Sequence, residues 1–106
     1  MGKLFIKQAT FTRKIGLLIH HAYLYGYDLT LGDCYRDNRC DYGHPKSTHR
    51  SRLAVDFNVG KDGNLLTGRE AEEAHNFLHD YWDILEGAKR IKQDLNHYSF
   101  KHNGVR

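Results

Sequence analysis

The chain has 106 residues, of which 40% are hydrophobic and 27% are charged, and its formal net charge is +3. These values exclude a disordered or fibrous protein, and the length suits a single domain over residues 1–106. The mild positive charge fits an anionic polymer as partner without requiring nucleic acid. Eight histidines are many for so short a chain and are a hint of metal binding.

The sequence shows no recognisable membrane-targeting signal. No apolar run reaches spanning length, and the first residues have neither a signal-peptide core nor a cleavage site. We therefore expect a monomer, made in the cytoplasm, without stable membrane insertion. In that reducing compartment Cys34 and Cys40 are expected to remain unbridged thiols.

The first half of the chain predicts a helix, a strand and a loop. Apolar residues recur at helical spacing over residues 11–25, and Gly26 stands where a left-handed C-terminal cap is expected. Thr10 or Thr12 can cap the start of this helix. A strand follows and ends near Tyr35, after which turn-forming residues predict a loop.

The second half begins with a strand whose two faces differ. Large apolar residues alternate over residues 53–59, so Asp56 points to the opposite face from them. A hairpin-like turn follows in "GKDGNLL". Thr67 and Glu70 form a capping box that opens a helix to about Leu85.

The chain then passes through a polar, irregular segment, "EGAKRIKQDLN", to a short last strand in "HYSFK". Helices and strands do not alternate regularly. The sequence therefore predicts an α+β fold with a small central antiparallel sheet and flanking helices.

Three residues form a candidate zinc site. His49 precedes the strand that carries Asp56, and His97 stands at the start of the last strand. Two histidines and one carboxylate with an open fourth position are typical of catalytic zinc. Such a set also accepts other divalent ions. The alternatives are a solvated strand face for Asp56, an ordinary loop histidine for His49 and a hydrogen-bonded, half-buried His97.

Asp94 is a candidate general base. It stands three residues before His97 in "DLNH", where Asp and Asn favour a turn that brings the two residues together. Zinc lowers the pKa of bound water to about 7, so a nearby carboxylate suffices to accept its proton. The alternative is that Asp94 only forms the turn.

His75 and His79 are four apart on the second predicted helix. "HNFLH" lacks the glutamate of H-E-x-x-H, so the helix does not match that peptidase motif. We interpret both as boundary residues at the edge of the apolar face.

Two motifs resemble one enzyme family. "STHRSRLAVDF" resembles the S-x-H-x-x-G-x-A-x-D signature of the M15 metallopeptidases, and "DLNH" resembles their closing acid-x-x-H element. "GYDLTLGDCYRD" is similar to the strand that brings an arginine into the site of phage members. The resemblance extends from about Phe11 to Phe100.

The resemblance implies zinc on His49, Asp56 and His97, with Asp94 as base. It also implies that Arg36 stabilises the substrate carbonyl or oxyanion and that Ser47 supports the His49 loop. The implied fold is the compact M15 α+β fold. The implied function is hydrolysis of a peptidoglycan stem peptide by a phage endolysin, which stays in the host cytoplasm until it is released to the cell wall.

Within the family, the short single-domain form favours cleavage of the L-Ala–D-Glu bond. D-Ala-D-Ala carboxypeptidase activity is the alternative. Two features depart from the family pattern. Arg52 replaces the signature's glycine, and "LEGAKRIKQ" stands in place of a Trp-Gly-Gly stretch.

A second function class is a binding module for wall polymer or nucleic acid. It rests on the basic segments "KSTHRSR" and "KRIKQ" and on the seven tyrosines. The charges are scattered and no nucleic-acid motif is present, so we expect no nucleic-acid partner.

Overall fold

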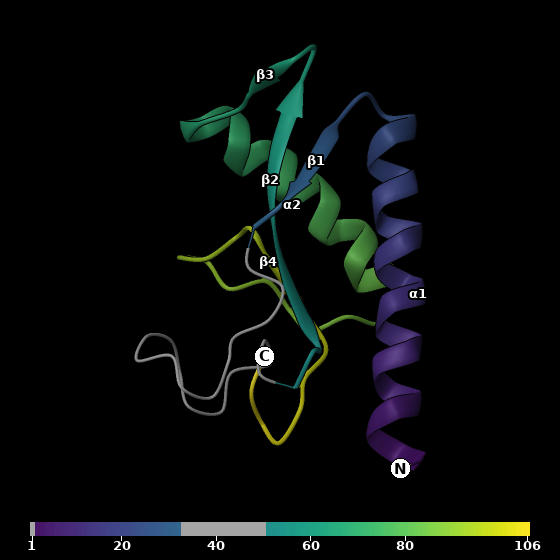
Figure 1. Cartoon of the computed structure of the whole chain (residues 1–106). Helices are drawn as coiled ribbons and strands as arrows, with labels where there is room; N and C mark the ends of the chain where they lie inside the picture. The colour runs from purple at the N-terminus through teal and green to yellow at the C-terminus, as the bar shows by residue number, and fades with distance from the viewer. Residues whose placement is uncertain (1, 33–50) are drawn as a thin grey trace.

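The computed structural model describes residues 2–32 and 51–106. Within these ranges the chain forms two helices and four strands of an antiparallel sheet (Figure 1). The elements are α1 (Gly2–Leu24), β1 (Asp28–Leu31), β2 (Ala54–Lys61), β3 (Asn64–Leu65), α2 (Gly68–Ile84) and β4 (His97–Ser99). The predicted α+β class with a small antiparallel sheet is confirmed.

Strand β2 is the centre of the sheet. One of its edges pairs with β1, and the other pairs with β4 near its start and with β3 near its end. Helix α2 crosses behind β2, and α1 runs along the side of the sheet next to β1 (Figure 1). One face of β2 is therefore covered by helices.

The core lies between that face and the helices. The alternating apolar residues of the β2 segment are at most 5% exposed: Leu53, Val55, Phe57 and Val59. They belong to one cluster with residues from both helices and from β4: Phe11, Leu18, Leu78, Trp82 and Tyr98. Full burial of a large apolar side chain contributes about 1.5–3 kcal/mol, so this cluster fixes which face of β2 turns inward.

Helix α1 begins nine positions before the predicted start. The preceding segment is rich in Leu, Lys, Gln and Ala, which are strong helix formers, so the helix extends through it. Thr12 lies inside the helix, where its hydroxyl donates to the carbonyl of Gln8 at 2.9 Å, so neither Thr10 nor Thr12 is a cap. The predicted C-cap is confirmed, since Gly26 has a φ of 86° and follows the last turn.

The turns of the second half follow the prediction closely. Asp62 and Gly63 both have positive φ and join Lys61 to its partner Asn64, as a two-residue hairpin requires. Thr67 is the N-cap of α2, but its side chain makes no capping hydrogen bond in the structure. The position of the capping box was therefore predicted correctly and its hydrogen bond was not.

The described residues contain no helix that is long and apolar enough to cross a membrane.

Candidate functional site

Asp56 and His97 face each other across two strands. β2 and β4 are antiparallel, and their register places Asp56 directly opposite His97. The ladder hydrogen bonds fall on the neighbouring pair, from the Phe57 amide to the Asn96 carbonyl. Asp56 and His97 thus occupy a non-hydrogen-bonded position, where opposed side chains approach most closely.

The two side chains are in contact on the sheet face opposite the core. His97 Nδ1 lies 3.1 Å from Asp56 Oδ1. The side chain of Asp56 is 15% exposed and that of His97 is 7% exposed. The interpretation of Asp56 as part of a solvated strand face is therefore wrong, because its carboxylate is largely covered and paired with an imidazole.

The contact has the length of a hydrogen bond, and this length is also compatible with joint coordination of one metal ion. Zinc binds imidazole nitrogen and carboxylate oxygen at about 2.0–2.2 Å, so two such ligands of a tetrahedral ion lie about 3.4 Å apart. The observed 3.1 Å between Nδ1 and Oδ1 needs an opening of only a few tenths of an ångström. The described residues contain no group of three or more His, Cys, Asp or Glu side chains placed to hold a metal.

Three predicted site residues, Arg36, Ser47 and His49, lie outside the described residues, as do the two cysteines. The geometry therefore bears on two of the three predicted ligands.

The segment before His97 bends as predicted. The amide of His97 donates to the carbonyl of Asp94 at 3.1 Å. The amide of Asp94 donates to the carbonyl of Ile91 at 2.8 Å. An i to i+3 bond of this kind brings the two Cα atoms within about 7 Å. Asp94 is exposed and one tight turn from His97. Its role as base stays a prediction.

Gly32 is a site neighbour that the sequence analysis missed. Its amide donates to the Asp56 carbonyl at 2.7 Å. A Cβ at this position would lie 3.2 Å from that oxygen and 3.3 Å from the Asp56 Cβ. Glycine therefore permits the close approach of the chain to Asp56, four positions before Arg36. A glycine inside the predicted strand was the available signal, because glycine in a strand often marks a close approach of another backbone.

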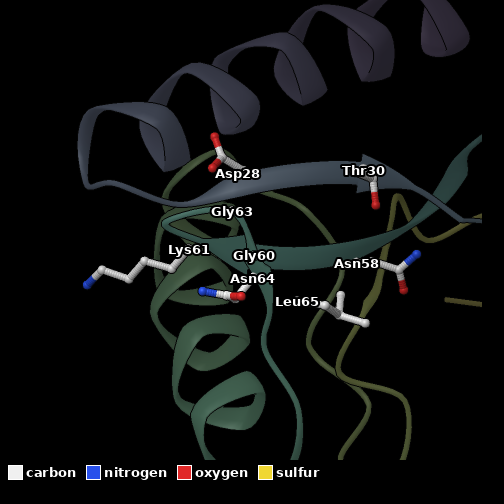
Figure 2. A pocket seen from close by; sticks show the side chains of 8 residues that line it. All are labelled: Asp28, Thr30, Asn58, Gly60, Lys61, Gly63, Asn64 and Leu65. Carbon is white, nitrogen blue, oxygen red and sulfur yellow. The ribbon is translucent and has the colours of Figure 1, made fainter.

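A groove lies on the same face of the sheet, farther along β2 from Asn58 onward. It encloses about 220 Å³ and is formed by β1, β2 and the β2–β3 hairpin. Figure 2 shows Thr30, Asn58 and Leu65, from three different strands, around it. Asn58 and Gly60 lie two and four positions after Asp56 in β2, so the three residues share one face of the sheet. At about 3.3 Å per residue, Gly60 lies about 13 Å from Asp56.

The histidines of α2 are not boundary residues. His75 and His79 are 6% and 0% exposed, and both lie against Tyr98 on the core side of β4. His75 Nδ1 is 2.7 Å from the Tyr98 hydroxyl. Burial lowers the pKa of both rings, that of His79 to about 4. The helical pattern predicted both residues at the edge of the apolar face. They are buried because β4 packs over that edge of the helix.

No protein-family model, curated protein or solved structure matches this chain. A functional hypothesis therefore rests on the residue pattern and on the geometry described above.

Proposed function

We propose that this protein is a zinc-dependent peptidase of the M15 type that hydrolyses the stem peptide of peptidoglycan. The observation that supports it most is the contact between Asp56 and His97. These residues are 41 positions apart, and the proposal requires them to be ligands of one metal. They meet on opposed strands, on the face away from the core, at a separation that suits joint coordination.

The backbone at Arg52 gives independent support. Arg52 has a φ of 59°, in the left-handed region that glycine adopts most readily. The M15 signature has glycine at this position. Arg52 therefore departs from the signature in its side chain, but its backbone has the conformation that the signature's glycine favours.

Each site residue has a proposed role. His49, Asp56 and His97 hold the zinc ion, which when bound lowers the pKa of water and polarises the scissile carbonyl. Asp94 accepts the proton of the attacking water and delivers it to the leaving amine. In the same reaction Arg36 stabilises the negative charge on the carbonyl oxygen, and Ser47 supports the loop of His49.

The groove suits a substrate longer than a dipeptide. A distance of about 13 Å corresponds to about four residues of extended peptide, so a stem peptide cleaved beside Asp56 reaches Gly60 and its neighbours. An extended substrate fits an endopeptidase better than a carboxypeptidase, which favours the L-Ala–D-Glu bond over the D-Ala-D-Ala bond.

The setting that we propose is that of a phage endolysin. It acts as a monomer, remains in the host cytoplasm until the membrane is opened, and then meets the cell wall. Its net charge of +3 favours contact with anionic wall polymer.

The decisive experiment is elemental analysis combined with digestion of purified peptidoglycan. The wild type is expected to carry about one equivalent of zinc per chain, as a mononuclear catalytic site does, and to release peptides that begin with D-Glu. His97→Ala should lose both zinc and activity. His20→Ala, which changes an exposed histidine of α1, is the matched control and should keep both. A wild type that takes up no metal when zinc is offered would refute the proposal.

A further inference from the structure

His79 is fully buried and, within the described part of the chain, its side chain makes one hydrogen bond. Its ring stacks on Tyr98, with ring centres 4.1 Å apart and planes 14° apart. Its Nε2 lies 2.7 Å from the carbonyl oxygen of Leu95. A carbonyl only accepts, so Nε2 carries the proton and donates. Helix α2 thereby makes a hydrogen bond to the segment that leads into β4.

Leu95 belongs to the turn that joins Asp94 to His97. The three carbonyls of this turn are bound from three directions. That of Asp94 accepts from the His97 amide, that of Leu95 from His79, and that of Asn96 from the Phe57 amide on β2. Hydrogen bonds thus join the turn to itself, to helix α2 and to the central strand β2. The bond to α2 comes from His79.

The chemistry of the ring suits a fixed donor. Burial lowers the pKa of His79 to about 4, so the ring is neutral near pH 7 and keeps one tautomer. Its Nδ1 is buried and has no hydrogen-bond partner among the described residues. An apolar side chain of similar size would fill the same space without this unpaired nitrogen. The advantage of histidine over an apolar residue at this position is the hydrogen bond to Leu95.

We propose that His79 is a positioning residue, which holds the Asp94–His97 turn so that the base and the metal ligand keep their relative placement. This inference rests on the proposed function for its catalytic consequence. Its structural content, that the bond to Leu95 fixes the turn, stands by itself.

The other side-chain bonds between α2 and this part of the chain lie before and after the turn, not on it. Arg90, four residues before Asp94, bonds to Asn76, Asp80 and Asp83 of α2. Trp82 Nε1 donates to the Ser99 carbonyl at 3.0 Å, and His75 bonds to the Tyr98 hydroxyl. Both contacts hold the strand after His97. Loss of the His79 bond should therefore loosen the turn while β4 stays anchored.

The test compares His79→Leu with His79→Gln. Leucine fills the space without a donor, whereas the glutamine amide nitrogen reaches about as far as Nε2 and restores one. In His79→Leu, amide exchange of His97 should accelerate at least tenfold relative to that of Tyr98. Its zinc affinity and its kcat should each fall about tenfold with little change in KM, since the turn positions both groups. His79→Gln should lie near the wild type.

A lower melting temperature in His79→Leu, with exchange at His97, zinc affinity and kcat all unchanged, would mean that His79 only fills the core, and would overturn the inference. If His79→Leu does not fold, His79→Asn, whose amide is one methylene shorter, takes its place against His79→Gln with the same two outcomes. Exchange at His97 needs neither zinc nor turnover. A metal-free, inactive wild type would thus refute the proposed function while the exchange still decides the role of His79.

Discussion

The two faces of β4 use histidine in opposite ways. On the outer face, His97 meets the carboxylate of Asp56 at 3.1 Å. On the core side, His75 and His79 lie around Tyr98, where burial lowers the pKa of both rings. His97 has a carboxyl partner on the outer face of the sheet, and the other two histidines are members of the core.

Under the proposed function, this contrast distinguishes His97, the proposed metal ligand, from the two histidines of α2. His75 and His79 have the more suggestive spacing in sequence, four apart on one helix. His97 has no histidine near it in the strand, yet the sheet register supplies a carboxylate. The carboxylate partner across the sheet distinguishes His97 better than sequence spacing does. Changes on the outer face should therefore reduce activity, and changes on the core side should reduce stability.

The largest expected effect is on activity, from Asp94→Asn at the proposed general base. Loss of a general base lowers kcat about a thousandfold, within the usual range for this kind of catalysis. The turn is made by backbone bonds and asparagine also favours turns, so the fold should not change. Digestion of purified peptidoglycan measures the activity.

Zinc content and melting temperature are the controls for Asp94→Asn, and both should equal those of the wild type. Activity within threefold of the wild type would remove Asp94 from the mechanism and leave it a turn former.

The largest effect on the core side is expected from Gly87→Ala. A Cβ at Gly87 would lie 2.0 Å from Nε1 of Trp82, which is fully buried and bonded to Ser99. The ring cannot move without breaking that bond, so the free energy of unfolding should fall by about 3 kcal/mol. Urea unfolding measures the change.

Gly16→Ala is the matched control for Gly87→Ala. A Cβ at Gly16 meets nothing within 4 Å, and alanine is the better helix former, so this change should stabilise the protein by up to about 1 kcal/mol. Equal destabilisation by both substitutions would contradict the packing around Trp82.

The stability of the core side should depend on pH through His79. Its pKa is about 4 when folded, against an ordinary value of 6.5, so between these values the unfolded chain binds more protons. The free energy of unfolding should therefore fall by about 3 kcal/mol as the pH drops from about 6.5 to about 4. Burial is the main cause of the lowered pKa. The hydrogen bond to Leu95 raises the pKa and opposes burial, Arg90 and His75 lower it, and Asp83 raises it.

His79→Gln removes this titration and leaves the neighbouring charges in place. Unfolding in urea at pH 7 and at pH 4 should show a smaller difference for the variant than for the wild type. A variant with the same pH dependence as the wild type would assign the effect to other groups.

Much of the fold was predictable because local signals agreed with the packing. The alternation around Asp56, the Asp62–Gly63 turn and the left-handed Gly26 each depend on a few neighbouring residues. The start of α1 was missed because no capping residue marks it, and a helix continues through favourable residues until something stops it.

The candidate site was predictable only in part, for a physical reason. The sequence identified Asp56 and His97 as residue types, but their contact depends on the register of β2 and β4, which long-range pairing sets. The burial of His75 and His79 depends on where β4 lies, and a helical wheel does not contain that information. Gly32 was missed because a close approach involves two segments.

The smallest expected effect concerns the backbone that supports the family resemblance. Arg52 has a φ of 59°, and a side chain in this region costs about 1–2 kcal/mol relative to glycine. Arg52→Gly and Arg52→Ala both remove the arginine side chain and differ in the Cβ atom. The glycine variant should therefore be more stable than the alanine variant by about 1 kcal/mol in urea unfolding, after allowing for glycine's greater freedom when unfolded. Equal stability would mean that the chain avoids the left-handed region here, and the argument from the signature's glycine would be lost while the contact between Asp56 and His97 would remain.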